Sequence, residues 1–163
     1  MLTTLTLGSI ASVSAAKIDL SQEIVIKAKR QAGDLKNKIA SYLDDVVITQ
    51  GSLTINADIV QVISNSDNDD KTYVAKGKPA KFEQLLDDGT PINLEADEIK
   101  YEPGNNTITI VGNAVLSQAG SEVKGGKIVY NTLTEQLSAE AGDNDEGITQ
   151  TILKPKEKAK DQQ

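Results

Sequence analysis

The chain contains no cysteine, no histidine and no tryptophan, and it has one phenylalanine among its 163 residues. Without cysteine there is no disulfide and no thiolate chemistry. Without histidine, the commonest general base and the commonest transition-metal ligand are both missing. The formal net charge of -7 argues against a protein that binds nucleic acid or an anionic membrane, since such a protein needs a basic face. The scarcity of aromatic rings also disfavours a protein that stacks bases.

The sequence contains no recognisable catalytic or metal-binding motif. Gly125-Gly126 lacks the Gly-Lys-Ser/Thr that follows in a phosphate-binding loop. The acidic stretch beginning at Asp67 does not have the spacing of a calcium loop, because the sixth position is Thr72 rather than Gly and the twelfth is Lys78 rather than Glu. We therefore expect no metal site and no cofactor, and we interpret residues 64–71 as an exposed loop.

Three segments of the chain resemble one another. Residues 53–62 and 92–101 both follow the pattern apolar-x-apolar-x-Ala-Asp-x-apolar-x-apolar. Residues 121–130 follow it with Gly125-Gly126 in place of Ala-Asp, and a fainter copy begins at Ile24. The anchor positions are 29, 39 and 29 residues apart: Ile26, Ile55, Leu94 and Val123. Such a period predicts stacked supersecondary units, which make an extended surface rather than a compact catalytic cleft.

Apolar and polar residues alternate through most of residues 17–153, with many Val, Ile and Thr, and this period of two is typical of β-strands. Residues 31–43 look partly helical, but the register of the repeats places a turn at Gly33-Asp34 between two strands. Short glycine-rich and asparagine-rich signals predict turns at regular intervals: Gln50-Gly51, Asp88-Gly89, residues 103–106, Gly112-Asn113, Gly125-Gly126 and residues 142–144. Together these features predict an all-β fold.

The two ends of the chain differ from its middle. Residues 1–16 carry no charged side chain and end in Ser14-Ala15-Ala16, which is typical of a secretory signal peptide and its cleavage site. The usual basic segment before it is missing, so we expect the natural start to lie upstream; a buried N-terminal strand or helix is the alternative. We expect one β-domain over residues 17–153, a disordered Lys-rich tail over residues 154–163, and an exported protein.

Asp58 and Asp97 are the best candidates for a catalytic carboxylate pair. They occupy the same position in two repeats, directly after Ala at a strand corner. An Asp at such a corner can accept hydrogen bonds from the neighbouring backbone and shape the turn, which is the interpretation we favour. The alternative from another class of protein is a secreted carbohydrate-active β-solenoid enzyme that uses these two carboxylates.

Several motifs occur in the order and spacing of one known family. The runs that carry the likeness are residues 46–51 (VVITQG), 55–58 (INAD), 77–82 (GKPAKF) and 112–118 (GNAVLSQ). Over residues 20–155 the chain resembles the OstA-like family. It departs from the family pattern at Asp44-Asp45, where Gly-Asn is usual, and at Gly126, where the third repeat usually keeps Asp.

The resemblance implies a repetitive, twisted, open β-jellyroll with a V-shaped apolar groove. It also implies a periplasmic bridge protein without catalysis, which conducts lipopolysaccharide from the inner to the outer membrane for outer-membrane assembly. The lipid A acyl chains would lie in the groove and the sugars outside it. The implied partners are lipopolysaccharide, further copies of the chain stacked head to tail, and the inner-membrane and outer-membrane components that share the fold. A membrane-anchored relative, or the periplasmic domain of an outer-membrane assembly protein, is the alternative within this fold.

The family's interior positions, matched residue by residue, imply a lipid-binding groove in this chain. The resemblance places five residues on its wall and two beneath: Ile24, Ile26, Phe82, Ile99 and Tyr101, with Ile55 and Leu94 below them. The terminal strands, near residues 24–27 and 148–153, are expected to be open edges at which copies join.

Overall fold

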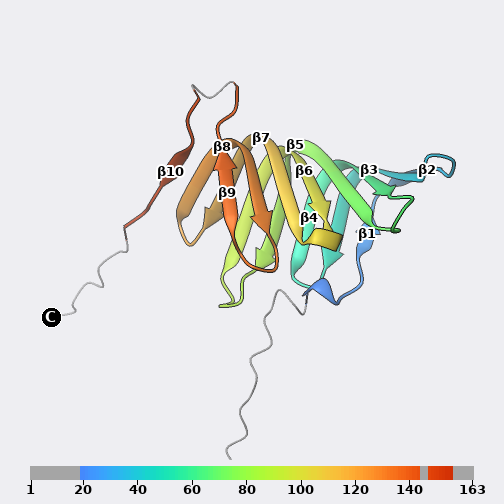
Figure 1. The fold of residues 1–163 in the computed structure, drawn as a ribbon, viewed down its shortest axis with the longest axis horizontal. Coiled ribbons are helices and arrows are strands. Elements are labelled where there is room, and N and C mark those ends of the chain that lie inside the picture. Colours follow the sequence, from blue (N-terminus) through green and yellow to red (C-terminus); the bar gives the residue numbers. More distant parts are fainter. Residues whose placement is uncertain (1–18, 144–146, 156–163) are drawn as a thin grey trace, which may run out of the picture.

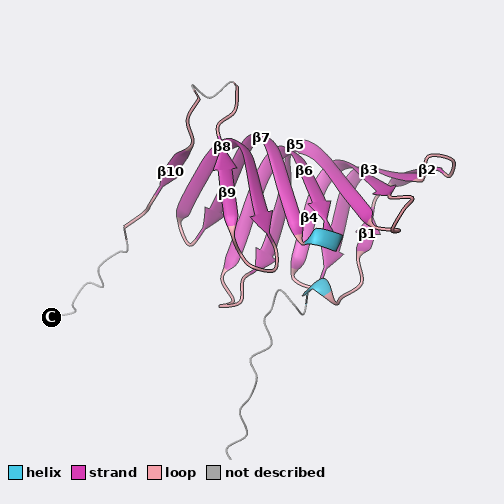
Figure 2. Ribbon diagram, viewed as in Figure 1, coloured by secondary structure: helices cyan, strands magenta, loops and turns pink. Residues whose placement is uncertain are grey.

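The structure, a computed structural model, describes residues 19–143 and 147–155. The predicted signal peptide and nearly all of the predicted tail lie outside the described residues. Strands make up most of the described chain (Figure 2), which confirms the all-β prediction. The elements are β1 (Val25–Lys27), β2 (Arg30–Asp34), β3 (Ile39–Gln50), β4 (Leu53–Ser64), β5 (Lys71–Leu85), β6 (Pro91–Glu102), the 3₁₀ helix η1 (Pro103–Asn105), β7 (Thr107–Gln118), β8 (Ser121–Asn131), β9 (Leu137–Glu140) and β10 (Gln150–Ile152).

All strands belong to one antiparallel sheet in the order β1-β3-β4-β5-β6-β7-β8-β10. At one end β1 pairs with residues 47–49 of β3, while β2 pairs with residues 39–43 of the same strand. At the other end, in the same way, β10 pairs with one part of β8 and β9 pairs with another part. Each end of the sheet therefore splits into two branches. Figure 1 shows β1 and β2 at one end of the molecule and β9 and β10 at the other.

Every pair of long strands shifts its register at the same level, and we call this row of shifts the corner line. The shifts lie at Leu43/Val46, Asn56/Ile59, Lys76/Ala80, Glu95/Glu98 and Val111/Ala114. The extra residues belong to β3, β5 and β7. A bulge bends its strand and increases the local twist. Because the bends are aligned, the whole sheet folds along the corner line into two facing half-sheets, which gives an open β-jellyroll.

Small side chains line the inside of the corner line. Ala80 of β5 pairs with Ala96 of β6, and Ala114 of β7 pairs with Gly125 of β8. The three alanines are buried, and a Cβ added at Gly125 would lie 2.8 Å from the backbone oxygen of Glu140. Facing sheets normally stand about 10 Å apart, and near the fold they approach more closely, so only small residues fit.

Large aliphatic and aromatic residues fill the space further from the corner line. Strand pairing links Ile26, Ile48, Ile55, Phe82, Leu94, Leu116 and Val123 into one row that crosses the whole sheet. All four repeat anchors lie in this row, which confirms that the repeated segments are equivalent strands. A facing row in the other half-sheet consists of Tyr42, Val60, Ala75, Ile99, Ile110 and Ile128. Burial of these two rows supplies the main stabilisation of the fold.

Three of the predicted turns are correct, two are wrong and one is displaced. The chain reverses at Gln50-Gly51, at Asp88-Gly89 and at residues 103–106, as expected. Gly112-Asn113 and Gly125-Gly126 instead lie inside β7 and β8, where the strand bends at the corner line without reversing. The turn predicted at residues 142–144 lies partly outside the described residues.

The predicted turn at Gly33-Asp34 is displaced by a few residues. Both residues belong to β2, and the hairpin turn follows at residues 35–38. There the Asp34 carboxylate accepts a hydrogen bond from the backbone N–H of Asn37 (3.0 Å) and so fixes the start of the turn.

Gly112 gives a direct test of the corner line. Its φ is +82°, and an added Cβ would lie 2.6 Å from the Asp97 carboxylate. We expect Gly112→Ala to lower the free energy of unfolding by about 1–3 kcal/mol, because an L-residue is strained in this conformation. Gly33→Ala is the control, since a Cβ added at Gly33 would have no atom within 4 Å. Equal thermal unfolding midpoints for the two variants would contradict this account of the corner.

Candidate functional site

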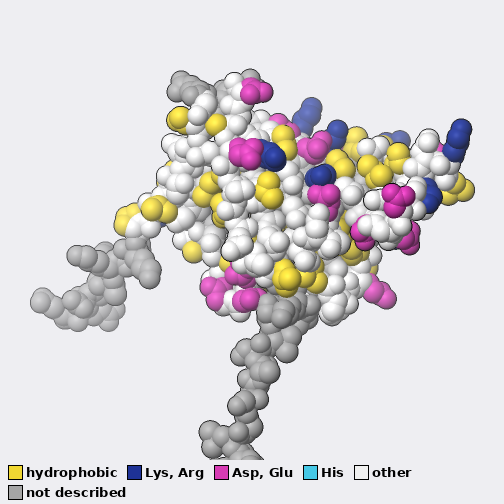
Figure 3. Space-filling model, in the orientation of Figure 1, with side chains coloured by type: hydrophobic (Ala, Val, Ile, Leu, Met, Phe, Trp, Pro, Cys, Tyr) yellow, Lys and Arg dark blue, Asp and Glu magenta, His cyan; other side chains and the backbone are white. Residues whose placement is uncertain are grey.

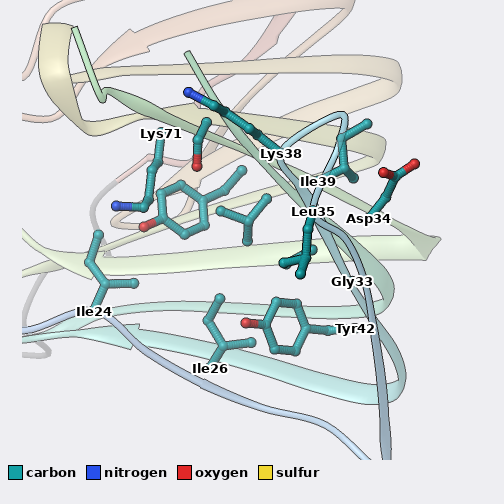
Figure 4. Close-up of a pocket in the computed structure, with 13 residues that line it drawn as sticks. Ile24, Ile26, Gly33, Asp34, Leu35, Lys38, Ile39, Tyr42 and Lys71 are labelled. Carbon is teal, nitrogen blue, oxygen red and sulfur yellow. The ribbon is translucent and has the colours of Figure 1, made fainter. Parts of the chain in front are cut away.

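β1 belongs to one half-sheet and β2 to the other, although both pair with β3. At this end of the sheet an apolar cavity of about 430 Å³ lies between the two half-sheets. Pockets that bind small molecules in proteins commonly measure about 300–1,000 Å³. Ile24 and Ile26 form one wall of this cavity (Figure 4), and Tyr42 lies close to them across the opening. Val62 of β4 and Tyr73 of β5 complete the apolar lining. The cavity therefore offers an apolar interior at the open end of the fold.

The seven predicted groove residues divide between this cavity and the closed core. Ile24 and Ile26 are half-buried and line the cavity. The remaining five are at most 1% exposed: Ile55, Phe82, Leu94, Ile99 and Tyr101. All seven belong to one continuous apolar interior, because the rings of Tyr73 and Tyr101 lie 5.9 Å apart and connect the cavity wall with the core. Lipid contact at all seven positions stays a prediction.

The sequence-based prediction missed several residues of the cavity. Tyr42 and Tyr73 line it but were not among the predicted groove residues. Strand pairing places Tyr73 opposite Tyr101, which is one of the predicted groove residues. Once the register is known, the repeat pattern therefore indicates that Tyr73 also faces the interior. No such pattern indicates that Tyr42 lines the cavity, because Tyr42 lies within residues 31–43, where the predicted turn at Gly33-Asp34 is displaced.

A buried hydrogen bond joins the two half-sheets on the side away from the corner line. The Tyr101 hydroxyl donates to Gln50 Oε1 over 2.6 Å. Gln50 Nε2 in turn donates to the backbone oxygens of Gln22 (3.1 Å) and Leu20 (3.4 Å). Burial raises the pKa of the Tyr101 hydroxyl well above its ordinary value, so this group stays a hydrogen-bond donor.

The segment of residues 19–23, which we call the N-terminal strap, is held in place by Asp19. This carboxylate is 5% exposed and accepts hydrogen bonds from the Ser52 backbone N–H (2.7 Å), the Ser52 hydroxyl and Gln84 Nε2 (3.3 Å). Gly51 makes room for it, because a Cβ at that position would collide with Asp19 Oδ1. These bonds connect the strap to Ser52, to Gln84 of β5 and, through Gln50, to Tyr101 of β6.

Asp58 and Asp97 lie on the outside of the fold, at the corner line. Both side chains are exposed, and β5 separates their strands, so their backbones stand about two strand spacings, or ~10 Å, apart. Asp97 Oδ2 accepts a hydrogen bond from Asn113 Nδ2 across the bend (3.0 Å), as a corner-shaping residue would. Neither residue lines the interior cavity.

The described residues offer no other obvious chemical site. No group of three or more His, Cys, Asp or Glu side chains within residues 19–143 and 147–155 is arranged to hold a metal ion. In the same part of the chain, no helix has the length and apolar character to span a membrane. The cavity between the half-sheets is therefore the candidate functional site.

Comparison with known proteins agrees with this architecture. Residues 25–136 match the family described as LptA/(LptD N-terminal domain) LPS transport protein. The chain belongs to this lipopolysaccharide transport family. Lipopolysaccharide export system protein LptA of Haemophilus influenzae is 35% identical over 94% of this chain and 89% of that protein. The Escherichia coli K12 protein of the same name is 33% identical over 89% of this chain and 79% of its own length.

A solved structure of the LptA/LptD N-terminal domain family shares the fold. The crystal structure of LptH, described as the LptA homologous periplasmic component of the lipopolysaccharide transport device of Pseudomonas aeruginosa, superposes with a TM-score of 0.76. It is 26% identical, and the match covers 85% of this chain and 99% of that one. These relatives are named as transport proteins, and none of these names describes an enzyme.

Two tyrosines provide a matched test of how the interior is closed. Tyr101→Phe leaves the buried Gln50 Oε1 without its donor, so we expect the free energy of unfolding to fall by about 1–3 kcal/mol. Tyr130 is equally buried, but its hydroxyl has no hydrogen-bond partner among the described residues. Tyr130→Phe should therefore be neutral or stabilising. Thermal unfolding of the two variants decides the matter, and a destabilised Tyr130→Phe with an unchanged Tyr101→Phe would contradict this assignment.

Proposed function

We propose that this chain is a periplasmic carrier that binds lipopolysaccharide through its lipid A acyl chains and conducts it from the inner to the outer membrane, without catalysis. The observation that carries the proposal is the continuity of the open cavity with the apolar core. Ile24 and Ile26 form a wall at the open end. Behind them, the two facing rows of large apolar residues run across the whole sheet.

The need for such a carrier follows from the cost of exposing acyl chains to water. Each methylene removed from water contributes about 0.8 kcal/mol, so a chain of roughly a dozen carbons costs on the order of 10 kcal/mol to expose. A multiply acylated lipid therefore needs continuous cover while it crosses an aqueous space. Equivalent positions repeated from strand to strand supply successive sites of similar affinity, so no single step is strongly uphill.

Deep entry of a lipid requires the closed part of the interior to open. The contacts on the side away from the corner line include the hydrogen bonds of Tyr101, Gln50 and Asp19, beside the buried apolar side chains of Leu53, Leu86 and Ile92. A hydrogen bond contributes about 0.5–1.5 kcal/mol net, or up to about 3 kcal/mol when one partner is charged. The few bonds involved are therefore comparable with, or weaker than, the gain from burying one acyl chain. We propose that incoming lipid displaces them and contacts Ile55, Phe82, Leu94, Ile99 and Tyr101.

The ends of the sheet suit a head-to-tail arrangement of copies. β1 and β10 are the terminal strands of the sheet order, so each has one side that pairs with no strand among the described residues. Unpaired strand edges associate readily with other strands, and a head-to-tail contact that does not close on itself builds a filament. We propose that copies of this chain, and inner-membrane and outer-membrane components with the same fold, join at these two edges.

Light scattering at rising protein concentration tests this association. We expect the mass to increase with concentration for the wild type. Ile152→Pro should suppress the increase, because proline removes a backbone donor from β10. A wild type that stays monomeric at high concentration would contradict joining at the edges.

Site-specific photo-crosslinking tests the path of the lipid. A photoreactive phenylalanine analogue at Ile26 or Phe82 should capture lipopolysaccharide, because these positions represent the open cavity and the core behind it. The same analogue at Asp67, in the exposed loop between β4 and β5, is the control and should capture none. Capture at Asp67 with none at Ile26 or Phe82 would mean that lipid does not travel inside the fold.

A further inference from the structure

Two lysines lie at the rim of the cavity, on either side of Ser64. Lys38 ends the turn between β2 and β3, and Lys71 begins β5. Ser64, at the end of β4, lies between them, because its backbone N–H donates to the Lys38 oxygen (3.1 Å) and its strand register pairs it with Lys71. All three residues line the cavity. The tertiary structure thus places at one rim two lysines that are 33 positions apart in sequence.

Neither lysine forms an ion pair with another side chain of the described residues. The nearby pairs Lys29–Asp45 and Arg30–Asp44 are ion pairs, but none of those within the described residues involves Lys38 or Lys71. Among the residues that line the cavity, Asp34 is the only acid, and its carboxylate is bonded to the backbone and side-chain nitrogens of Asn37. Figure 4 shows the amino groups of both lysines on the opposite side of the pocket from Asp34.

Charged side chains of both signs surround this rim. Two of the five basic residues in residues 27–38 form ion pairs with Asp44 and Asp45, and the loop of residues 65–70 before Lys71 carries three acids. Figure 3 shows Lys and Arg side chains together with Asp and Glu side chains at the end of the molecule that carries β2 and β3. Among the residues that line the cavity, however, the two lysines outnumber the single acid, Asp34. A local excess of positive charge attracts and orients an anionic ligand even when the total charge is negative.

We propose that Lys38 and Lys71 form an anion site that holds a phosphate group on the head of the bound lipid, while its acyl chains enter between Ile26 and Tyr42. This inference rests on the proposed function, since it takes the occupant of the cavity to be an acylated lipid. Lysine ammonium groups bind phosphate as point charges. Both side chains are exposed, so their contribution is screened by water. Their role is therefore to select and orient phosphorylated lipids, whereas burial of the acyl chains supplies most of the affinity.

The test compares lipids that differ only in phosphate. Binding of diphosphorylated lipid A and of the same lipid A without its phosphates is measured by native mass spectrometry for the wild type and two double variants. In Lys38→Gln/Lys71→Gln both rim charges are removed. In Lys36→Gln/Lys154→Gln two charges are removed from exposed residues that do not line the cavity, so the net charge is matched.

The wild type and the control variant should bind phosphorylated lipid A roughly tenfold more tightly than the dephosphorylated form, as expected for charge-assisted contacts. The rim variant should lose this preference and keep its affinity for the dephosphorylated form. Lys38→Arg/Lys71→Arg should retain the preference, since the charges remain. A wild type without preference, or a rim variant that keeps it, would overturn the anion site and leave the proposed function intact. Failure of the wild type to bind either lipid would overturn the proposed function instead.

A further arm identifies the source of the phosphate. Phosphatidylglycerol and diacylglycerol differ at the head group, and inorganic phosphate serves as a competitor. If the preference for phosphatidylglycerol over diacylglycerol also depends on Lys38 and Lys71, the site accepts phosphorylated lipids in general. If this dependence appears for lipid A alone, the site is specific for glycolipid phosphates. Competition by inorganic phosphate in the wild type, and its absence in the rim variant, would support the site in either case.

Discussion

The alignment of bends in every long strand is the constraint on which the rest of this structure depends. A ten-stranded antiparallel sheet with one regular register would expose one face along its whole length. Because β3, β5 and β7 each carry extra residues at the same level, the sheet folds along one line and its apolar face turns inward. The row of alanines beside the fold permits this closure. An interior suited to a long apolar ligand is the direct result.

That interior is closed over most of its length. The interactions that close it differ between the side near the corner line and the opposite side. Near the corner line it is closed by the packing of small, buried residues beside the bends of the strands. On the opposite side buried apolar side chains are accompanied by polar contacts, including those of Asp19 with Ser52 and Gln84. In the proposed function, an entering lipid opens the fold on this side. The cavity between β1 and β2 is then the part of the interior that stands open before any ligand arrives.

The split ends of the sheet connect architecture with assembly. At each end two short strands share one long strand, so the two half-sheets present separate edges. A neighbouring copy that pairs with such edges would extend both half-sheets and continue the interior between them. The lysine rim lies at one of these ends. In the proposed mechanism a phosphorylated head group is therefore recognised where lipid would pass from one copy to the next.

The sequence by itself determined the strand content, the equivalence of the repeats and which alternate residues of each strand face inward. Alternation of Val and Ile with polar residues is a local signal, and the anchors Ile26, Ile55, Leu94 and Val123 do lie in one row. The apolar positions of the candidate interior followed from the same pattern together with the family resemblance.

Only the tertiary structure decided how the sheet folds and where its interior opens. Gly112-Asn113 has the local composition of a reversing turn, yet it bends a continuous strand, because pairing with β6 and β8 continues on both sides of it. Whether an apolar residue lies in a cavity or in a closed core depends on the distance between the half-sheets. That distance depends on contacts between residues remote in sequence, such as Tyr101 with Gln50. The placement of Lys38 and Lys71 at one rim depends on the same long-range register, which no local pattern encodes.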